Sequence, residues 1–342
     1  MSVSSNTVEV DVLVVGAGPV GLFGAYYAGV RGLRTAVVDS LSQVGGQVTA
    51  MYPEKQIYDI AGVPAVSGRT LVANLVEQAA PYDPTYLLGQ EAQTLDRLPV
   101  PCRPDRLVIR TSAGTEIVTG TVVVTGGIGT FTPRPLPAGE AFLGRGLDYF
   151  VPSSAAYAGC DVVVVGGGDS AVDWALMLHP VARSVTVVHR REAFRAHPGS
   201  LERLRSAPVE IITNAQVVST MGAEALQHIE IRVAGDDAAQ SLPCDRLVAA
   251  LGFTANLGPL REWGLELHDN RHLVVDSAMR TALDGVFAAG DIVDYDGKVR
   301  LIATGFGEVA TAVNNAAVHL DPAAQLFPGH STDRPTSVPQ PA

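Results

Sequence analysis

The feature that most restricts the fold of this chain is a pattern of strand, glycine turn and helix that occurs twice. Residues 12–26 read VLVVGAGPVGLFGAY, and residues 162–175 read VVVVGGGDSAVDWA. In each stretch β-branched residues are followed by a glycine cluster and then by helix-forming residues, which is the pattern of a dinucleotide-binding turn. The repetition predicts two nucleotide sites in one chain of 342 residues, enough for about two domains.

Other apolar, β-branched runs lie between helical patterns along the chain. They are RTAVV (34–38), VVVT (122–125), SVTVV (184–188) and RLVAAL (246–251). Continuous apolar strands separated by helices predict parallel sheets covered on both faces. We therefore expect an α/β protein with two Rossmann-like, three-layer dinucleotide-binding domains. Two alternating runs, EIVTGTVVV (116–124) and HIEIRV (228–233), are expected to add antiparallel strands.

The charge and the cysteines exclude several classes of function. The formal net charge is -11 and no run of lysine or arginine occurs, which argues against a nucleic-acid partner and against a polybasic membrane anchor. Cys102, Cys160 and Cys244 form neither a CxxC pair nor a zinc spacing. We expect a soluble, cytoplasmic protein with buried thiols and no metal site.

The first glycine turn, GAGPVG, satisfies the GxGxxG pattern with Gly16, Gly18 and Gly21. These glycines permit a tight turn and let a pyrophosphate approach the backbone amides at a helix N-terminus. Asp39 ends the next strand about 20 residues on, where a carboxylate accepts the hydroxyls of an adenine ribose. Because Asp39 would repel a 2′-phosphate, the first site is not expected to take NADP. The alternative is a tight turn with a solvated aspartate.

The second glycine turn is followed by bases instead of an acid. Its expected contacts with a dinucleotide come from the turn GGGDSA, namely Gly166, Gly168, Asp169, Ser170 and Ala171. The next strand ends in His189, Arg190 and Arg191, with Arg195 about one helical turn later. Guanidinium groups bind phosphate in a fixed fork, so this cluster predicts a site for the 2′-phosphate of NADP. A solvated basic surface is the alternative.

A third motif follows near the C-terminus. TALDGVFAAGDIVDY (281–295) reads as a short strand that ends in Gly290 and Asp291, and GFGEVATAVNNAAVHL (305–320) reads as a helix. A glycine there lets the backbone approach a ligand, the carboxylate can hold a hydroxylated chain, and the helix N-terminus can stabilise negative charge. Alone it is an acidic turn before a helix. Together with the first turn, it is expected to close over a dinucleotide that begins near Gly16.

Taken together, these motifs resemble the two-dinucleotide flavoproteins of the thioredoxin reductase family, in which FAD sits on the first turn and NADPH on the second. Residues 125–127, TGG, resemble that family's crossing segment, although alanine is more usual at the first position. The resemblance implies an NADP-binding domain, residues 126–252, inserted in an FAD-binding domain. The FAD-binding domain is then formed by residues 1–125 and 253–342, with a C-terminal tail from about 321.

Two cysteine positions of related enzymes are occupied by other residues. Thioredoxin reductases carry a redox-active CxxC before the second turn, where this chain has FVPS (150–153). Bacillithiol disulfide reductases carry a cysteine within the first turn, where this chain has Val20. What remains resembles the ferredoxin–NADP reductases of the thioredoxin-reductase type. The likeness covers nearly the whole chain and rests on GGQVTAMYPEKQIYDIAG, VVTGGIGTFTPR, GGGDSAVDWAL, VHRREAFRAH, FAAGD, GFGEVATAVNNA and GHST.

That resemblance also implies the residues of the flavin site. The expected FAD contacts come from Asp39, Gln47, Tyr52, Ala92, Phe131, Asp291 and Thr332. Tyr52 and His330 are expected to stack on opposite faces of the flavin ring as the catalytic pair. Because Pro53 follows Tyr52, the backbone of Tyr52 is expected to be extended. A packed turn tyrosine and a solvated tail histidine are the alternatives.

The implied activity is transfer of electrons from NADPH through FAD to a one-electron carrier, ferredoxin or flavodoxin, reversible in principle. The family also implies a homodimer. The alternatives are an NADPH oxidase or diaphorase, a disulfide reductase that lacks the CxxC, and a non-catalytic nucleotide sensor. Because such carriers are usually acidic and this chain is itself at -11, we expect a local positive rim, with Lys55, Lys298 and Arg300 as its candidates.

Overall fold

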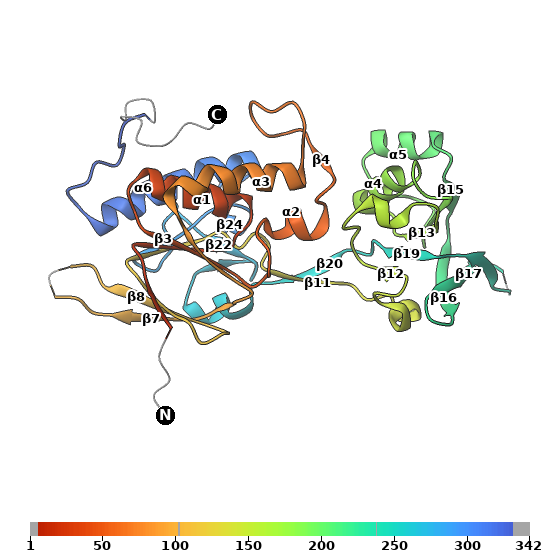
Figure 1. Cartoon of the computed structure of the whole chain (residues 1–342), viewed down its shortest axis with the longest axis horizontal. Coiled ribbons are helices and arrows are strands. Elements are labelled where there is room, and N and C mark those ends of the chain that lie inside the picture. The colour runs from red at the N-terminus through yellow and green to blue at the C-terminus, as the bar shows by residue number, and fades with distance from the viewer. Residues whose placement is uncertain (1–5, 102, 237, 331–342) are drawn as a thin grey trace. The chain divides into compact units, whose positions relative to one another are not determined.

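The computed structural model describes residues 6–101, 103–236 and 238–330 (Figure 1). It divides the chain into two compact units. Unit 1 contains the residues up to Phe131 together with those from Ala255 onward, and unit 2 is Thr132–Thr254. Unit 2 is therefore inserted in the sequence of unit 1. The observed boundaries lie a few residues after the expected ones, 125/126 and 252/253.

A parallel sheet forms the centre of unit 1. Its strand order is β23-β10-β2-β3-β6, with the bounds Val286–Ala288, Thr121–Val124, Val12–Val15, Thr35–Asp39 and Thr85–Leu88. Every neighbouring pair in this order is parallel. The strands VLVV and TVVV are buried over their whole length, as expected for β-branched residues covered on both faces. The expected α/β fold class is confirmed.

Helices cover one face of this sheet. Figure 1 shows α1, α3 and α6 lying side by side, and α1 packs against both of the others. The helices of unit 1 are α1 (Pro19–Val30), α2 (Gly46–Met51), α3 (Gly68–Ala79) and α6 (Ile302–Leu320). Helix α6 begins at Ile302, three residues before the GFGEV motif from which it was predicted.

A second sheet, not a helical layer, contacts the central sheet of unit 1 from β8 and β9. Its order is β1-β9-β8-β7, with the bounds Thr7–Glu9, Glu116–Thr119, Arg106–Thr111 and Ala92–Leu98. The antiparallel pairing expected over 116–124 is confirmed for β9, which runs antiparallel to β8, and is wrong for β10, which belongs to the parallel sheet because the chain changes sheets at Gly120. A Cβ at Gly120 would lie 2.2 Å from Cδ2 of Leu320, so a larger residue at this crossing would require that side chain to move.

Short strands complete unit 1 and connect it to unit 2. β4 (Gln56–Ile57) pairs with β5 (Val66–Ser67). A small sheet has the order β21-β22-β24, with the bounds Leu267–His268, His272–Val274 and Val293–Asp294. The chain leaves unit 1 through β11 (Thr130–Pro133) and returns through β20 (Phe253–Asn256), and these two strands pair with each other.

Unit 2 repeats the plan on a smaller scale. Its parallel sheet has the order β12-β19-β13-β14-β15, with the bounds Leu147–Asp148, Arg246–Ala249, Asp161–Val165, Ser184–Val188 and Glu210–Ile212. Its helices are α4 (Asp169–Leu178) and α5 (Pro198–Ser206). An antiparallel sheet is formed by β16 (Ala215–Gly222), β17 (Leu226–Val233) and β18 (Gln240–Pro243), which confirms the antiparallel strand expected at HIEIRV.

No helix within the described residues has both the length and the apolar character that a membrane span requires.

Candidate functional site

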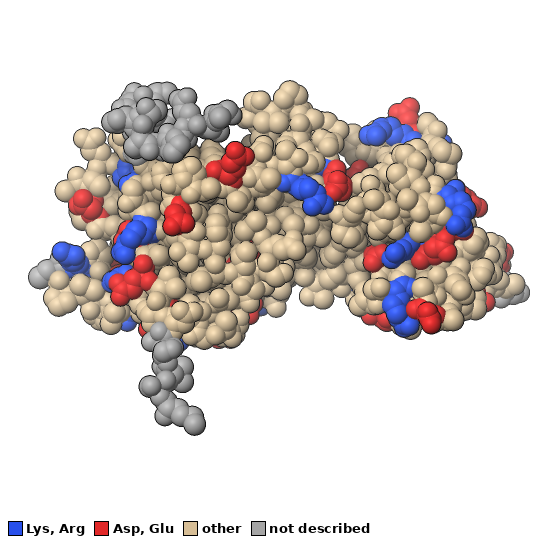
Figure 2. Space-filling view, viewed as in Figure 1, with Lys and Arg blue, Asp and Glu red and all other residues tan. Residues whose placement is uncertain are grey.

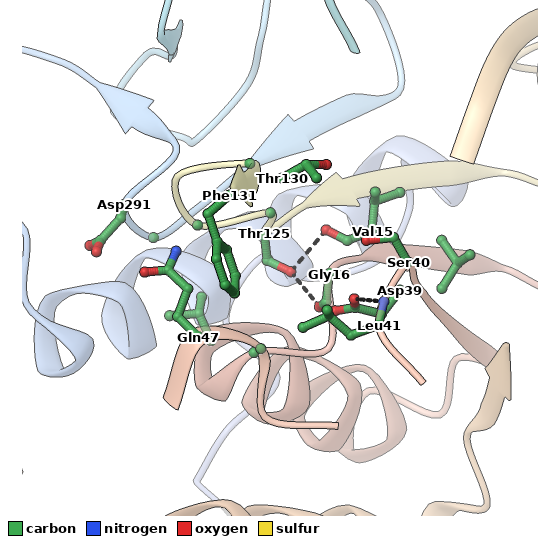
Figure 3. Close-up of a pocket in the computed structure, with 18 of the residues that line it drawn as sticks. Val15, Gly16, Asp39, Ser40, Leu41, Gln47, Thr125, Thr130, Phe131 and Asp291 are labelled. Carbon is green, nitrogen blue, oxygen red and sulfur yellow. Dashed lines mark hydrogen bonds between the residues drawn. The ribbon is translucent and has the colours of Figure 1, made fainter. Parts of the chain in front are cut away.

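A pocket of about 220 Å³ opens at the carboxyl ends of the central strands of unit 1 (Figure 3). This is the edge at which open parallel sheets bind ligands. The pocket is lined by the ends of β2, β3 and β10 and by the first residues of α1, α2 and α6. Further lining comes from residues 40–41, from residues 90–92, from the segment between Gly126 and Phe131, from the segment between Leu257 and Leu260, and from the Gly290–Asp291 turn. Eight of the expected residues line it: Gly16, Gly18, Asp39, Gln47, Tyr52, Ala92, Phe131 and Asp291.

The first glycine turn forms the floor of this pocket. Gly16 has a φ of +113°, and a Cβ on it would lie 2.7 Å from the carbonyl oxygen of Thr125. Gly21 does not line the pocket. It lies beneath the turn, where a Cβ would come within 1.9 Å of the Gly16 carbonyl oxygen. Gly18 caps α1 without a side chain, so the amide end of the helix is open to a ligand.

Thr125 stands where the resemblance would place an alanine, and its side chain contacts the first glycine turn. Its Oγ1 donates to the carbonyl oxygen of Gly16 at 2.9 Å, with that of Val15 also within 3.2 Å. The hydroxyl therefore ties the end of β10 to the glycine turn, as the dashed lines in Figure 3 show. The sequence predicts Thr125 as part of the crossing segment, but it does not predict the contact with the first turn, because that contact depends on the pairing of β10 with β2.

Asp39 holds one end of the pocket, and its carboxylate is fixed by backbone donors. Oδ2 accepts from the amide of Ala17 at 2.6 Å, and Oδ1 accepts from the amide of Leu41 at 2.8 Å. Burial raises the pKa of Asp39 even though both hydrogen bonds favour the ionised form. Additional hydroxyl donors from a ligand would offset this cost of burial, which suits the carboxylate to the ribose role expected of it.

Asp291 lies at the opposite end of the pocket from Asp39 (Figure 3). Its pKa is raised mainly by burial, while the positive charges of Lys298 and Arg300 act in the other direction. The carbonyl oxygen of Asp291 lies 3.1 Å from Nδ1 of His272, so the turn is held from the β22 side. The pocket therefore has a partly buried carboxylate at each end.

Aromatic and amide side chains occupy the space between these ends. Figure 3 shows Phe131 and Gln47 facing the pocket between Asp291 and Asp39. Gly127 lies beside Gln47 with a φ of +61°, which favours glycine, and a Cβ there would lie 2.8 Å from the amide nitrogen Nε2. Tyr52 follows α2 with φ −149° and ψ 51°, so the extended backbone expected for it is wrong. Its amide instead donates to Val48 at 3.3 Å and closes the helix.

The tail residue expected on the flavin is not part of this pocket. His330 is exposed, and its ring meets that of Phe327 edge-on at 5.2 Å. The tail follows α6, and Arg31 of α1 donates to the carbonyl oxygen of Gln325 at 3.0 Å. The stacking role of His330 stays a prediction. Thr332 lies outside the described residues.

The glycine turn of unit 2 has the same backbone design as the first. The amide of Gly166 donates to the carbonyl oxygen of Val188 at 3.0 Å, and a Cβ on Gly166 would lie 2.5 Å from the carbonyl oxygen of Ala250. Gly168 caps α4 without a side chain. Ser170 is exposed and Ala171 is buried beneath the turn. Asp169 is exposed and accepts from the amide of His197 at 2.8 Å, which ties the start of α4 to the start of α5.

The four bases after β14 divide into two kinds. Arg190, Arg191 and Arg195 are exposed, as a phosphate site requires. His189 is 9% exposed, and its ring lies against the backbone of Gly167, where a Cβ would come within 2.2 Å of it. Its Nε2 is 3.2 Å from the carbonyl oxygen of Ala193, and burial lowers its pKa. His189 therefore supports the glycine turn, whereas the arginines face solvent.

The prediction of a positive rim around the pocket is wrong for one of its three residues, Lys298. The side chain of Lys298 is only 2% exposed and pairs with Glu308, so it cannot meet a partner protein. Arg300 is 39% exposed and pairs with Asp294 at 3.0 Å. Lys55 is exposed. Figure 2 shows acidic and basic side chains intermixed over the face in view, with no extended patch of one sign.

Of the two described cysteines, Cys160 is partly buried and Cys244, which is fully buried, is poorly suited to disulfide exchange. Cys160 and Cys244 are both free thiols, and the stretch 150–153 contains no cysteine. Cys244 is buried, and this burial raises the pKa of its thiol to about 12, so the thiolate is scarce at neutral pH. Cys102 lies outside the described residues.

Comparisons with known proteins agree on one family. A family described as pyridine nucleotide-disulphide oxidoreductase matches residues 10–316. A protein of Salinispora arenicola named ferredoxin–NADP reductase is 62% identical over 325 residues, which are 95% of this chain and 99% of that protein. A protein of the same name from a Nocardioides species is 59% identical over 330 residues, 96% of this chain and 99% of its own. Among solved structures, the thioredoxin reductase of T. acidophilum shares the fold with a TM-score of 0.73 at 23% identity, over 92% of this chain and 99% of that one.

Proposed function

Because this chain belongs to the pyridine nucleotide-disulphide oxidoreductase family, we propose that it is a ferredoxin–NADP reductase. In this proposal the pocket of unit 1 binds FAD, and the second glycine turn with its arginines binds NADP(H). The chemistry that bound FAD supplies is acceptance of an electron pair from NADPH and release of single electrons. The observation that carries the proposal is a pocket on a glycine turn with a partly buried carboxylate at each end, in a chain without a CxxC.

The residues of unit 1 fit an FAD molecule. Gly16 permits the tight turn, and Gly18 leaves room for a pyrophosphate against the open amide end of α1. Asp39 is positioned by two backbone donors to accept ribose hydroxyls, and Asp291 offers a second acceptor at the far end. Phe131 and Tyr52 contribute aromatic surface that excludes water from the space between the carboxylates.

The residues of unit 2 fit a nucleotide that carries a 2′-phosphate. The turn at Gly166–Gly168 repeats the first one, but the strand after it ends in bases. Arg190, Arg191 and Arg195 are exposed and can form charge-assisted hydrogen bonds with phosphate oxygens. We propose that His189 acts beneath the turn as a support.

A one-electron carrier protein is the partner that this set of residues favours. No dithiol stands at 150–153, and the described Cys244 is buried with a raised pKa. Relatives that cover nearly the whole chain carry the name ferredoxin–NADP reductase. Flavodoxin stays an alternative carrier. A homodimer stays a prediction, which light scattering of the purified protein can test, and a cytoplasmic location stays a prediction too.

The decisive experiment compares three acceptors side by side. The purified protein is expected to be yellow, with about one FAD per chain, and to reduce ferredoxin rapidly with NADPH. Thioredoxin should be reduced slowly or not at all. Colourless protein that cannot be reconstituted with FAD would contradict the proposal. So would a protein that reduces a diaphorase dye with NADPH but reduces no carrier protein faster than the dye.

A cysteine-free variant provides the control for a disulfide route. Cys102, Cys160 and Cys244 are replaced by serine, and serine at 244 can still donate to the carbonyl oxygen of Arg246, which the thiol contacts at 3.3 Å. Ferredoxin reduction should survive this change. Rapid thioredoxin reduction by the wild type that vanishes in the variant would instead indicate a disulfide reductase.

A further inference from the structure

A buried ion pair lies directly behind the Gly290–Asp291 turn of the pocket. Lys298, one of only two lysines in the sequence, has a side chain that is 2% exposed, and Glu308 of α6 is 5% exposed. Their charged groups meet at 2.5 Å. Taking two charges out of water costs several kcal/mol per ion, and such pairs are often replaceable by apolar residues without loss of stability. The presence of this pair is therefore weak evidence for a role in stability.

The contacts of Glu308 join both ends of the loop that carries Asp291. Oε2 accepts from the amide of Gly290 at 2.8 Å. Oε1 accepts from the hydroxyl of Tyr295 at 2.6 Å and from Nζ of Lys298. The ammonium group also lies 5.6 Å from the centre of the Tyr295 ring. One carboxylate on a long helix thus fixes residues 290, 295 and 298 at once.

The first of these contacts acts directly on the pocket. Gly290 and Asp291 both line it, and a hydrogen bond to the amide of Gly290 fixes the peptide immediately before Asp291. On the other side, the carbonyl oxygen of Asp291 lies 3.1 Å from His272, and the amide of Leu273 donates to Ile292 at 2.8 Å. The turn is therefore held between α6 and β22, which limits where the Asp291 carboxylate can lie.

We propose that Glu308 is a positioning residue for cofactor binding: it fixes the peptide of Gly290, and through it the carboxylate of Asp291, while Lys298 compensates its buried charge. This inference rests on the proposed function, since it takes FAD as the ligand of the pocket. It assigns a binding role to two residues that do not line the pocket. It also predicts that the affinity for FAD depends on the side-chain oxygen at position 308 that accepts from the Gly290 amide, and not on the charges of Glu308 and Lys298.

Two double variants separate the acceptor from the charges. Glu308→Gln with Lys298→Met removes both charges but keeps an amide oxygen that can accept from Gly290. Glu308→Met with Lys298→Met removes the charges and the acceptor while keeping a side chain of similar length. FAD is titrated into the full-length chain after removal of flavin, and the dissociation constant is measured. We expect the Gln variant to bind within about threefold of wild type and the Met variant about tenfold more weakly.

A third comparison tests whether Glu308 acts through Asp291. With Asp291→Ala in the background, the Gln and Met variants should bind FAD equally, because the carboxylate to be positioned is gone. A residue that only stabilised the fold would keep its effect there. Val313→Ala is the matched control, since Val313 is fully buried in the same helix. It should lower the melting temperature and leave the FAD dissociation constant unchanged.

The outcomes distinguish this inference from the proposed function. If the wild-type chain does not bind FAD, the proposed function fails. If it binds FAD and the two double variants bind equally well, or if their difference persists without Asp291, the positioning role is overturned. Should the Met variant not fold, Glu308→Asp supplies the test, because it withdraws the carboxylate by one methylene. Weaker FAD binding by that variant supports the proposal, and unchanged binding overturns it.

Discussion

The two glycine turns share one backbone design and differ in the side chains that complete them. The amide of Gly16 donates to Val38 at 2.8 Å, and the amide of Gly166 donates to Val188 at 3.0 Å, so each turn is fastened to the end of the next strand. In unit 1 the acid at that strand end is itself held by two backbone amides. In unit 2 the arginines after the strand are exposed.

This difference teaches how one motif can serve two kinds of ligand. An acceptor fixed before the ligand arrives loses little entropy on binding, which favours tight retention. Long exposed side chains must be ordered at the moment of binding, which lowers affinity and allows exchange. The first turn is therefore suited to a cofactor that stays with the chain, and the second to a nucleotide that comes and goes.

The largest effect is expected when the backbone of one turn is broken and the other is left intact. Gly16→Ala places a Cβ 2.7 Å from the carbonyl oxygen of Thr125 at a φ of +113°. We expect loss of FAD and a fall in the free energy of unfolding of at least about 2 kcal/mol. Flavin content and urea denaturation measure this.

Two matched changes accompany it. Gly18→Ala should leave the free energy of unfolding nearly unchanged, because a Cβ there meets nothing within 4 Å. Gly166→Ala, whose Cβ would lie 2.5 Å from the carbonyl oxygen of Ala250, should abolish the use of NADPH while FAD is retained. Loss of FAD from the Gly166 variant would show that the two turns are not independent.

A smaller effect is expected from the arginines of the second turn. Arg190→Ala should lower kcat/KM for NADPH about ten- to a hundredfold, because one charge-assisted contact contributes about 1.5–3 kcal/mol. The value for NADH should hardly change. Arg205→Ala, which removes an exposed arginine from α5 of the same unit, is the control. Equal losses with both nucleotides would place the 2′-phosphate elsewhere.

The smallest effect is expected in the pH dependence of stability. The first glycine turn is supported by backbone contacts, whereas the second lies against the titratable ring of His189. The pKa of His189 is lowered from 6.5, first by burial and then by the nearby arginines. A depressed histidine pKa contributes stability that is present above pH 6.5 and is lost as the pH falls through the folded-state pKa. His189→Phe keeps a ring beneath Gly167 but cannot titrate.

Urea denaturation between pH 7 and pH 5 checks this. Unfolding of the wild type should become easier by up to about 1 kcal/mol per pH unit relative to the Phe variant. Parallel curves for the two proteins would remove His189 from the pH response.

Local pattern was enough to predict the parts of this molecule that depend on local backbone chemistry. The glycine turns, the strands beside them and the acid at Asp39 all follow from residue type and spacing, and the comparisons confirm the family and the fold. The resemblance supplied Phe131, Ala92 and Gln47, whose place in the pocket depends on long-range packing. Their role as FAD contacts stays a prediction.

The spacing of residues in the sequence could not predict which side chains are buried or which distant residues they contact. Lys298 was expected at a surface rim because it follows Asp291 closely in sequence. Its carboxylate partner comes ten residues later on α6, and only the packing of that helix brings the two charges together inside the protein. Gly120 is similar, since nothing in EIVTGTVVV says that a leucine 200 residues later will occupy the space beside it.

The insertion of one unit in the other sets the order in which the two can be completed during synthesis. The ribosome delivers all of Thr132–Thr254 before it delivers β23 and α6. Until then β10 lacks one of its neighbours in the sheet, and α1 lacks the helix that packs on it. Domains generally fold as units while the chain is still emerging. The second unit, although it interrupts the first, is therefore the one whose whole sequence is available first.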